Sequence, residues 1–126
     1  VATRNGVKYI NDSAAKSLSA TWFSIENINE PVIWIALAGD LDYEEMIPVV
    51  RQHVKSVICV GDDVEMMRST LGYIIKDGVL KAETMEEAMK MIEDKAVSGD
   101  SVLFSPGCES AETRKMEKVF VKMAKE

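Results

Sequence analysis

The sequence lacks the features of a membrane or secreted protein. None of its apolar runs approaches the roughly 20 residues that a membrane-spanning helix needs, and no basic segment followed by an apolar one opens it. The chain has 126 residues, enough to bury a core, and we predict a single domain over residues 1–126. We therefore expect a cytoplasmic domain that does not insert into a membrane.

Clustered positive charge is missing as well. The chain carries 15 Lys and Arg residues against 21 Asp and Glu residues, a net charge of -6. Nucleic-acid binding depends on a basic surface, so we expect no nucleic-acid partner. A local anion site is still compatible with this balance, because backbone amides and one or two lysines can bind an anion.

Side chains for nucleophilic or metal chemistry are few. Of the two cysteines, Cys59 lies in an apolar run and Cys108 in a predicted loop, a spacing that indicates reduced thiols and no zinc site. The single histidine, His53, falls at the end of a predicted helix, so a catalytic pair with Cys108 is not favoured. The acidic residues are spread over helix faces, without the clustering that a metal site requires.

Two phosphate-binding motifs are absent. The chain contains no Gly-x-x-x-x-Gly-Lys-Ser/Thr loop and no Gly-x-Gly-x-x-Gly after a strand. We therefore do not expect it to act alone as a nucleotide triphosphatase or a dehydrogenase.

The chain does contain apolar strands that alternate with amphipathic helices. Asn5-Gly6 predicts a hairpin between residues 1–3 and 7–10. Continuous apolar runs predict buried strands at 32–37, 57–60 and 101–104, and residues 73–80 predict a small hairpin or an irregular edge. Helical spacing predicts helices at 18–25, 42–54, 66–71, 85–96 and about 109–125. This order predicts an α/β fold with a mostly parallel sheet and an antiparallel hairpin at one edge.

Several helix starts carry capping signals. Asp42 with Glu45, and Thr84 with Glu87, have the spacing of capping boxes. Asp62 or Asp63 is expected to cap the short helix that follows. Pro48 is expected to bend its helix or to delay the regular part of it.

Two loops after strands are rich in hydroxyl and amide groups, and ligands of open α/β sheets bind at such loops. In the first loop, Asn11, Asp12 and Ser13 either bind a ribose or an amino acid, with Lys16 supplying charge, or only cap the next helix. The residues alone favour the capping alternative. In the second loop, Ser105 to Ser110 either presents Ser105 and backbone amides to a carboxylate or forms a simple loop and cap.

A resemblance to a known family bears on this choice. The segment Asn5–Ser13 (NGVKYINDS), followed by Ala20-Thr21, resembles the opening of the C-terminal domain of Mur ligases, particularly of members that add D-glutamate to UDP-N-acetylmuramoyl-L-alanine. The similarity continues through Pro31–Ala36, Asp42-Tyr43, Val57–Gly61, Met85–Ala88 and Ser105-Pro106-x-Cys108-x-Ser110. It implies a Rossmann-like, three-layer α/β/α fold.

The resemblance also implies a function in peptidoglycan-precursor synthesis. Such ligases use ATP and Mg²⁺ to activate a carboxylate as an acyl phosphate, which the amine of an amino acid then attacks. A central P-loop domain and an N-terminal UDP-sugar domain are the implied partners, and the C-terminal domain closes over ATP. By matching position, Asn11 and Asp12 face the nucleotide. Ser105 holds the carboxylate of the amino acid, and further substrate-side candidates are Ser13, Lys16 and Ser110.

The chain departs from the family pattern at charged positions. Where the family has Asn-Asp-Ser-Lys-Ala-Thr-Asn, Ala14 replaces the lysine, Lys16 the threonine and Ser17 the asparagine. A glycine-rich loop is shortened to residues 37–41 without its lysine, and the segment after Ser110 lacks the aromatic residues of the family. Charge-assisted hydrogen bonds contribute about 1.5–3 kcal/mol each. We therefore predict a degenerate site, no catalysis by this domain alone, and neither ATP nor Mg²⁺ tightly bound to it.

Two further hypotheses stay open. The chain is a non-catalytic binding or assembly module that keeps the ligase-domain fold, or it is an engineered or truncated variant with simplified loops. A P-loop domain encoded upstream would favour the ligase.

Overall fold

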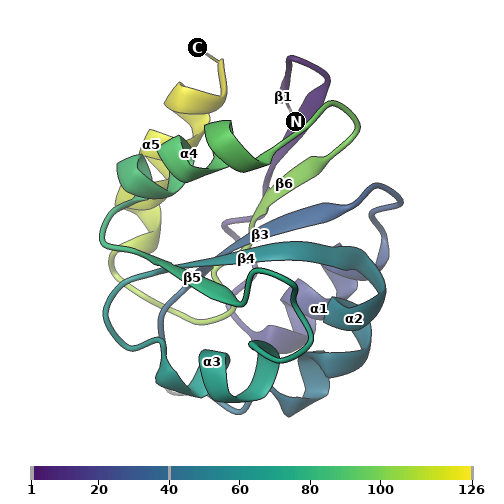
Figure 1. Ribbon diagram of the computed structural model, residues 1–126. Helices are drawn as coiled ribbons and strands as arrows, with labels where there is room; N and C mark the ends of the chain where they lie inside the picture. Colours follow the sequence, from purple (N-terminus) through teal and green to yellow (C-terminus); the bar gives the residue numbers. More distant parts are fainter. Residues whose placement is uncertain (1, 40, 126) are drawn as a thin grey trace.

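The computed structural model describes residues 2–39 and 41–125, which form one mixed sheet covered by helices on both faces (Figure 1). The strand order is β1-β2-β6-β3-β4-β5. The strands are β1 (Ala2–Arg4), β2 (Val7–Asn11), β3 (Val32–Leu37), β4 (Val54–Val60), β5 (Val79–Ala82) and β6 (Ser101–Phe104). The helices are α1 (Leu18–Glu26), the 3-10 helix η1 (Glu44–Met46), α2 (Ile47–His53), α3 (Glu65–Leu71), α4 (Met85–Lys95) and α5 (Thr113–Lys125).

The antiparallel edge of the sheet is the predicted hairpin. Asn5 and Gly6 have φ values of 54° and 77°, the left-handed conformations that a tight two-residue hairpin turn requires. β1 pairs antiparallel with β2, and the other four pairings are parallel. The predicted fold class is therefore confirmed, while Val1, which the prediction included in the hairpin, lies outside the described residues.

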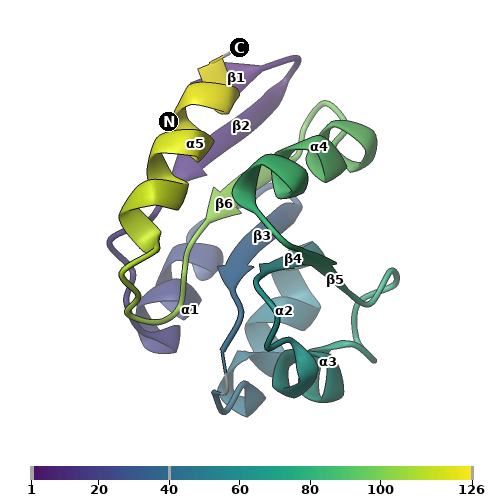
Figure 2. The same ribbon diagram turned by 90° about the vertical axis from the view of Figure 1, so that its left-hand side faces the viewer.

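The two faces of the sheet bury separate apolar clusters. Helices α1, α2 and α3 cover one face, and α4 and α5 cover the other, as the two views of Figures 1 and 2 show. Alternate residues of β3 serve both clusters: Trp34 and Ala36 pack under the first set of helices, and Ile33 and Ile35 under the second. Burial on both faces explains why this strand is a continuous apolar run.

The last strand lies in the middle of the sheet. β6 pairs with β2 on one side, where Val102 is opposite Tyr9, and with β3 on the other, where Val102 is opposite Ile33. The chain therefore crosses from β5 at one edge back over the sheet, through α4, before β6 enters between β2 and β3. None of the helices within residues 2–39 and 41–125 is long and apolar enough to cross a bilayer.

Some predicted details are correct and others are wrong. Thr84 caps α4 by accepting a hydrogen bond from the Glu87 backbone amide at 3.1 Å, and Pro48 lies in the first turn of α2, after η1. The predicted capping by Asp42, and by Asp62 or Asp63, is wrong. Asp42 accepts from the Glu44 amide in a turn before η1, and α3 begins at Glu65, after Val64, without a side-chain cap.

Residues 73–80 form neither the small hairpin nor the irregular edge that the sequence predicts. The last two of them begin β5, a regular strand that pairs in parallel with β4. The Asp77-Gly78 turn, with Gly78 at a φ of 70°, reverses the chain before the strand and does not join two strands of a hairpin. Similarly, α5 starts at Thr113 and not near residue 109, because residues 105–112 form the loop that leaves β6.

Gly61, directly after β4, provides a test of how tightly the ends of the strands are packed. Its φ is 122°, and a Cβ atom there would lie 2.9 Å from the Cβ atom of Ala38 after β3. We expect Gly61→Ala to lower the free energy of unfolding by about 2–5 kcal/mol, through backbone strain and steric overlap together. Gly99→Ala is the matched control, because its φ is 101° but its Cβ position is open, so about 1–2 kcal/mol is expected. Urea denaturation measures both, and equal losses would contradict the predicted overlap.

Candidate functional site

The polar loops predicted from the sequence meet at the carboxyl ends of β2, β6 and β3. Asn11 at the end of β2 is opposite Phe104 at the end of β6, and Phe104 is opposite Ile35 of β3. The chain leaves β2 toward α1 on one face and leaves β6 toward α5 on the other. Diverging connections of this kind open the crevice in which α/β proteins bind ligands.

A short chain of buried hydrogen bonds joins the two loops. The Ser105 hydroxyl lies 2.8 Å from a carboxylate oxygen of Asp12, to which it donates, and 2.7 Å from the Thr21 hydroxyl of α1. Both hydroxyl residues are fully buried. The Trp34 indole nitrogen donates to the Ser105 carbonyl oxygen at 2.8 Å, so β3 also holds this residue. The loops after β2 and β6 are therefore fixed to each other through side chains.

The predicted helix-capping role of Asp12 and Ser13 is wrong. The residue that caps α1 is Ser17, whose hydroxyl oxygen accepts a hydrogen bond from the Ala20 amide at 3.2 Å. Asp12 and Ser13 lie in turns before the helix, where the Ser13 amide donates to the Asn11 side-chain oxygen at 3.1 Å. Their side chains are therefore used elsewhere.

A carboxylate from the last helix reaches the first loop. The Asn11 side-chain amide and the Ser13 hydroxyl donate to the same oxygen of Glu117, at 2.8 and 2.7 Å. These two hydrogen bonds, the one from Asn11 being the stronger influence, hold the pKa of Glu117 below its usual value. The sequence gives no signal for this contact, because Glu117 is more than 100 residues from both partners and reads as one acidic residue on an amphipathic helix.

The other predicted site residues do not join this network. Lys16 is exposed and forms no ion pair or hydrogen bond within the described ranges. Ser110 is exposed, and its hydroxyl oxygen accepts from the Glu112 amide in a turn before α5. Since Ser105 is fully buried while Ser110 is exposed, Ser110 is the better placed of the two to contact a ligand. The ligand contacts assigned to these side chains remain predictions.

The shortened loop after β3 packs against the same region. The Leu37 amide donates to the Pro106 carbonyl oxygen at 3.2 Å, and the Tyr43 hydroxyl donates to the Gly39 carbonyl oxygen at 3.1 Å. Asp40, in the middle of this loop, lies outside the described residues.

Neither cysteine is arranged as a nucleophile. Burial raises the pKa of Cys59 to about 12, and it also raises the pKa of Cys108. His53 ends α2 and precedes β4, so it lies at the amino end of the strands, opposite to the end where Cys108 follows β6. In residues 2–39 and 41–125, no three His, Cys, Asp or Glu side chains are grouped to hold a metal ion.

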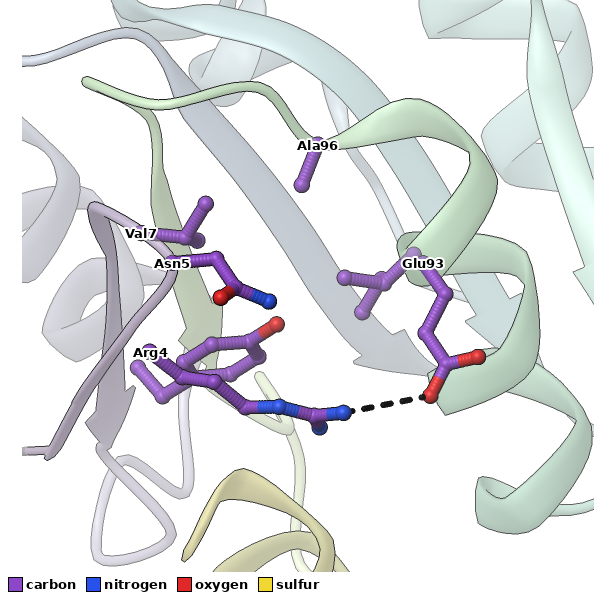
Figure 3. Close-up of a pocket in the computed structure, with 7 residues that line it drawn as sticks. Arg4, Asn5, Val7, Glu93 and Ala96 are labelled. Atoms are coloured by element: carbon purple, nitrogen blue, oxygen red, sulfur yellow. Dashed lines mark ion pairs between the residues drawn. The ribbon is translucent and has the colours of Figure 1, made fainter. Parts of the chain in front are cut away.

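A cavity of about 320 Å³ lies between the hairpin and α4, away from the polar loops (Figure 3). Its main charged group, Arg4, forms an ion pair with Glu93 at 3.7 Å and donates to the Met123 carbonyl oxygen at 3.2 Å. Tyr9 also lines this cavity, and burial raises the pKa of its hydroxyl. Because the charge of Arg4 is already paired, we assign no ligand to this cavity.

Known proteins are similar in sequence to most of this chain. Residues 1–108 match the family model of the Mur ligase, glutamate ligase domain. The chain is 37% identical over 110 residues to UDP-N-acetylmuramoylalanine--D-glutamate ligase of Christiangramia forsetii, covering 84% of this chain and 24% of that protein. It is 38% identical over 112 residues to the ligase of the same name from Salinibacter ruber, covering 87% and 24%. The chain thus spans about a quarter of the length of these relatives.

Solved structures share the fold. A domain of a putative UDP-N-acetylmuramate:L-alanyl-gamma-D-glutamyl-medo-diaminopimelate ligase from Haemophilus ducreyi superposes with a TM-score of 0.64 at 12% identity, covering 95% of this chain and 93% of that one. A murein peptide ligase from Psychrobacter arcticus gives a TM-score of 0.68 at 7% identity, covering 98% and 28%. Because this chain covers only 28% of the Psychrobacter arcticus protein, the same fold occurs in that protein as one part of a longer chain.

The buried hydrogen bonds of Ser105 predict a stability effect. Ser105→Ala removes the donor to Asp12 and leaves the buried Thr21 hydroxyl without this partner. We expect the free energy of unfolding to fall by about 1–3 kcal/mol in urea denaturation. Ser69→Ala, at an exposed serine of α3, is the control and should change it by less than about 0.5 kcal/mol. A Ser105→Ala protein as stable as the control would show that the chain of hydrogen bonds does not hold the loops.

The two thiols should differ in reactivity. In the native protein at pH 7.5 we expect Cys108 to react with a disulfide reagent more slowly than a free thiol, because its raised pKa leaves less thiolate. Cys59 should react only after unfolding, because it is fully buried and its pKa is about 12. Thiol titration with and without urea measures both rates. Rapid reaction of Cys108 would instead indicate an activated nucleophile.

Proposed function

The chain belongs to the Mur ligase, glutamate ligase domain family, and we propose that it is the C-terminal domain of a ligase that adds D-glutamate to UDP-N-acetylmuramoyl-L-alanine. The curated relatives are named as D-glutamate ligases of this kind, and the matched part of this chain covers 24% of each of them. We further propose that the domain acts in the cytoplasm and is not catalytic alone.

One observation supports this function more than any other. The Asn11-Asp12-Ser13 segment and the Ser105–Ser110 segment lie far apart in the sequence, yet the Ser105–Asp12 hydrogen bond of 2.8 Å brings them together at the crevice. These are the two segments that the family resemblance assigns to the nucleotide and to the incoming amino acid. Their meeting at the diverging strand ends is the arrangement that a shared ligand site needs.

In this proposal the domain supplies one wall of a site that other domains complete. The central domain would bring the P-loop, ATP and Mg²⁺, and the N-terminal domain would hold the UDP-sugar. ATP supplies the phosphate that activates the substrate carboxylate. The residues of this chain that would face the nucleotide are Asn11 and Asp12, and the residues on the amino-acid side are Ser13, Lys16 and Ser110. Ser105 would position Asp12.

As they stand, these residues fit ATP and Mg²⁺ poorly. Ala14 brings no charge to the loop, Lys16 makes no contact with the network, and the donors of Asn11 and Ser13 are taken by Glu117. A phosphate or a carboxylate would meet the negative charge of Glu117 there. Within residues 2–39 and 41–125, no Lys or Arg side chain is bonded to the network, although the charge of Arg114 acts on Glu117. We therefore propose that Asn11 and Asp12 face a nucleotide only when the other domains hold it, and that this domain alone binds neither ATP nor Mg²⁺ tightly.

The poor fit of these loop residues to ATP and Mg²⁺ favours a second candidate, a binding or assembly module that keeps the ligase-domain fold without the ligase chemistry. The two candidates differ in what precedes the chain. An upstream P-loop domain, with D-glutamate-dependent phosphate release from ATP, would support the ligase, and absence of both would support the module.

The full-length protein provides the test. With UDP-N-acetylmuramoyl-L-alanine, ATP and Mg²⁺, we expect weak D-glutamate-dependent phosphate release, and we expect Ala14→Lys to raise kcat/KM by about tenfold or more, because one charge-assisted contact is regained. Ser69→Lys adds the same charge on α3 and should change nothing. No activity in either protein would refute the ligase proposal, and an equal gain in both would refute the role of position 14.

A further inference from the structure

We propose that the turn formed by Asn11 and Ser13 is a carboxylate-binding clamp, and that Glu117 of α5 occupies it so that the chain occludes its own ligand loop. The inference deepens the proposed function and rests on it in one respect, namely that this loop faces a ligand. It differs in one assignment, because it places Asn11 beside Ser13 on the amino-acid side of the site and not on the nucleotide side. The chemical class of the ligand comes from the contacts themselves.

The clamp is defined by two converging donors. The Asn11 side-chain nitrogen and the Ser13 hydroxyl lie 2.8 and 2.7 Å from one carboxylate oxygen of Glu117. The Asn11 side-chain oxygen accepts from the Ser13 backbone amide at 3.1 Å, which fixes the two donors relative to each other. Short hydrogen bonds from two neutral donors to one anionic oxygen are the contacts that a bound carboxylate requires.

The shape of the loop does not depend on Glu117. The Asp12 amide donates to the Phe104 carbonyl oxygen at 2.8 Å, and the Ala15 amide donates to the Asp12 carbonyl oxygen at 3.0 Å. The Ser105 hydroxyl holds the Asp12 carboxylate from the other side. Removal of the Glu117 carboxylate should therefore free the donors of the clamp without unfolding the turn.

Glu117 is held over the clamp by the packing of its own helix. Phe120, three residues later, is buried and contacts the Phe104 ring at a centroid distance of 5.6 Å and the Tyr9 ring at 6.3 Å. Residues three apart share one face of a helix, so this anchor directs Glu117 toward the sheet ends. An incoming carboxylate has to displace a tethered competitor, and its apparent affinity falls with the fraction of open clamp.

Nuclear magnetic resonance on the 15N-labelled 126-residue chain tests the inference. The probes are D-glutamate and glutarate, followed through the Asn11 side-chain amide and the Ser13 backbone amide. We expect Glu117→Ala to bind both probes at least about tenfold more tightly than the unmodified chain. Glu117→Gln keeps an acceptor oxygen but no charge and should show a smaller gain. Glu112→Ala removes the same charge from an exposed side chain that makes no hydrogen bond or ion pair with the described residues of the loop, and it should show no gain in binding.

Each outcome decides the matter. The proposal is supported if Glu117→Ala shifts the two signals, keeps the Asp12 and Ala15 amides protected from exchange, and gains probe binding that Glu112→Ala does not. It is overturned if the substitution leaves the signals unmoved, if they move without a gain in binding, if exchange protection is lost, or if the unmodified chain binds as tightly. Equal affinity for glutarate and D-glutamate would leave the clamp intact and count only against the proposed function.

Discussion

The insertion of β6 between β2 and β3 is the constraint on which the rest of the structure depends. β2 and β3 follow each other in the chain but do not pair, and β6 provides the hydrogen bonds that join them. Without it, the hairpin of β1 and β2 would have no connection to the sheet of β3, β4 and β5. The same insertion places Ser105, the residue after β6, between Asp12 and Thr21. The polar loops therefore become one site only when the last strand is in place.

This dependence gives the polar residues a structural role beside any chemical one. Ser105 is fully buried and bonded to two partners, and Trp34 donates to its carbonyl oxygen. A buried hydroxyl that loses its partner costs free energy, so such residues stabilise the fold even where no substrate binds. Part of a ligand motif can thus persist for reasons of stability, whether or not the chain binds a ligand there.

The sequence predicts the elements better than it predicts the contacts between them. The apolar run at Val32–Leu37 and the Asn5-Gly6 turn carry local signals, since burial on both faces and positive φ values each restrict the residue types allowed. The sequence does not predict β5 as a strand, because its four residues, Val79–Ala82, are too few to show an apolar strand pattern. Their place in the sheet is set by pairing with β4. Asp62 resembles a helix cap locally, but its carboxylate pairs with Lys81 at 3.1 Å. The Glu117 contact depends on the packing of α5 and leaves no local trace.

Some residues of the polar loops are needed by the fold, and others would be needed only for ligand binding. Only the second group can distinguish an active ligase domain from a domain that keeps the fold without activity. Asp12 and Ser105 do not discriminate, because the fold itself uses both side chains. The discriminating positions are those whose side chains the fold does not use: Ala14 and Lys16 are exposed and make no contact with the buried network. At such positions chemistry alone can require a particular residue, so a lysine absent from position 14 is stronger evidence about function than an aspartate present at position 12. Glu117 adds to that evidence, because a carboxylate placed on the donors of the loop opposes the binding of the anions that a ligase must hold.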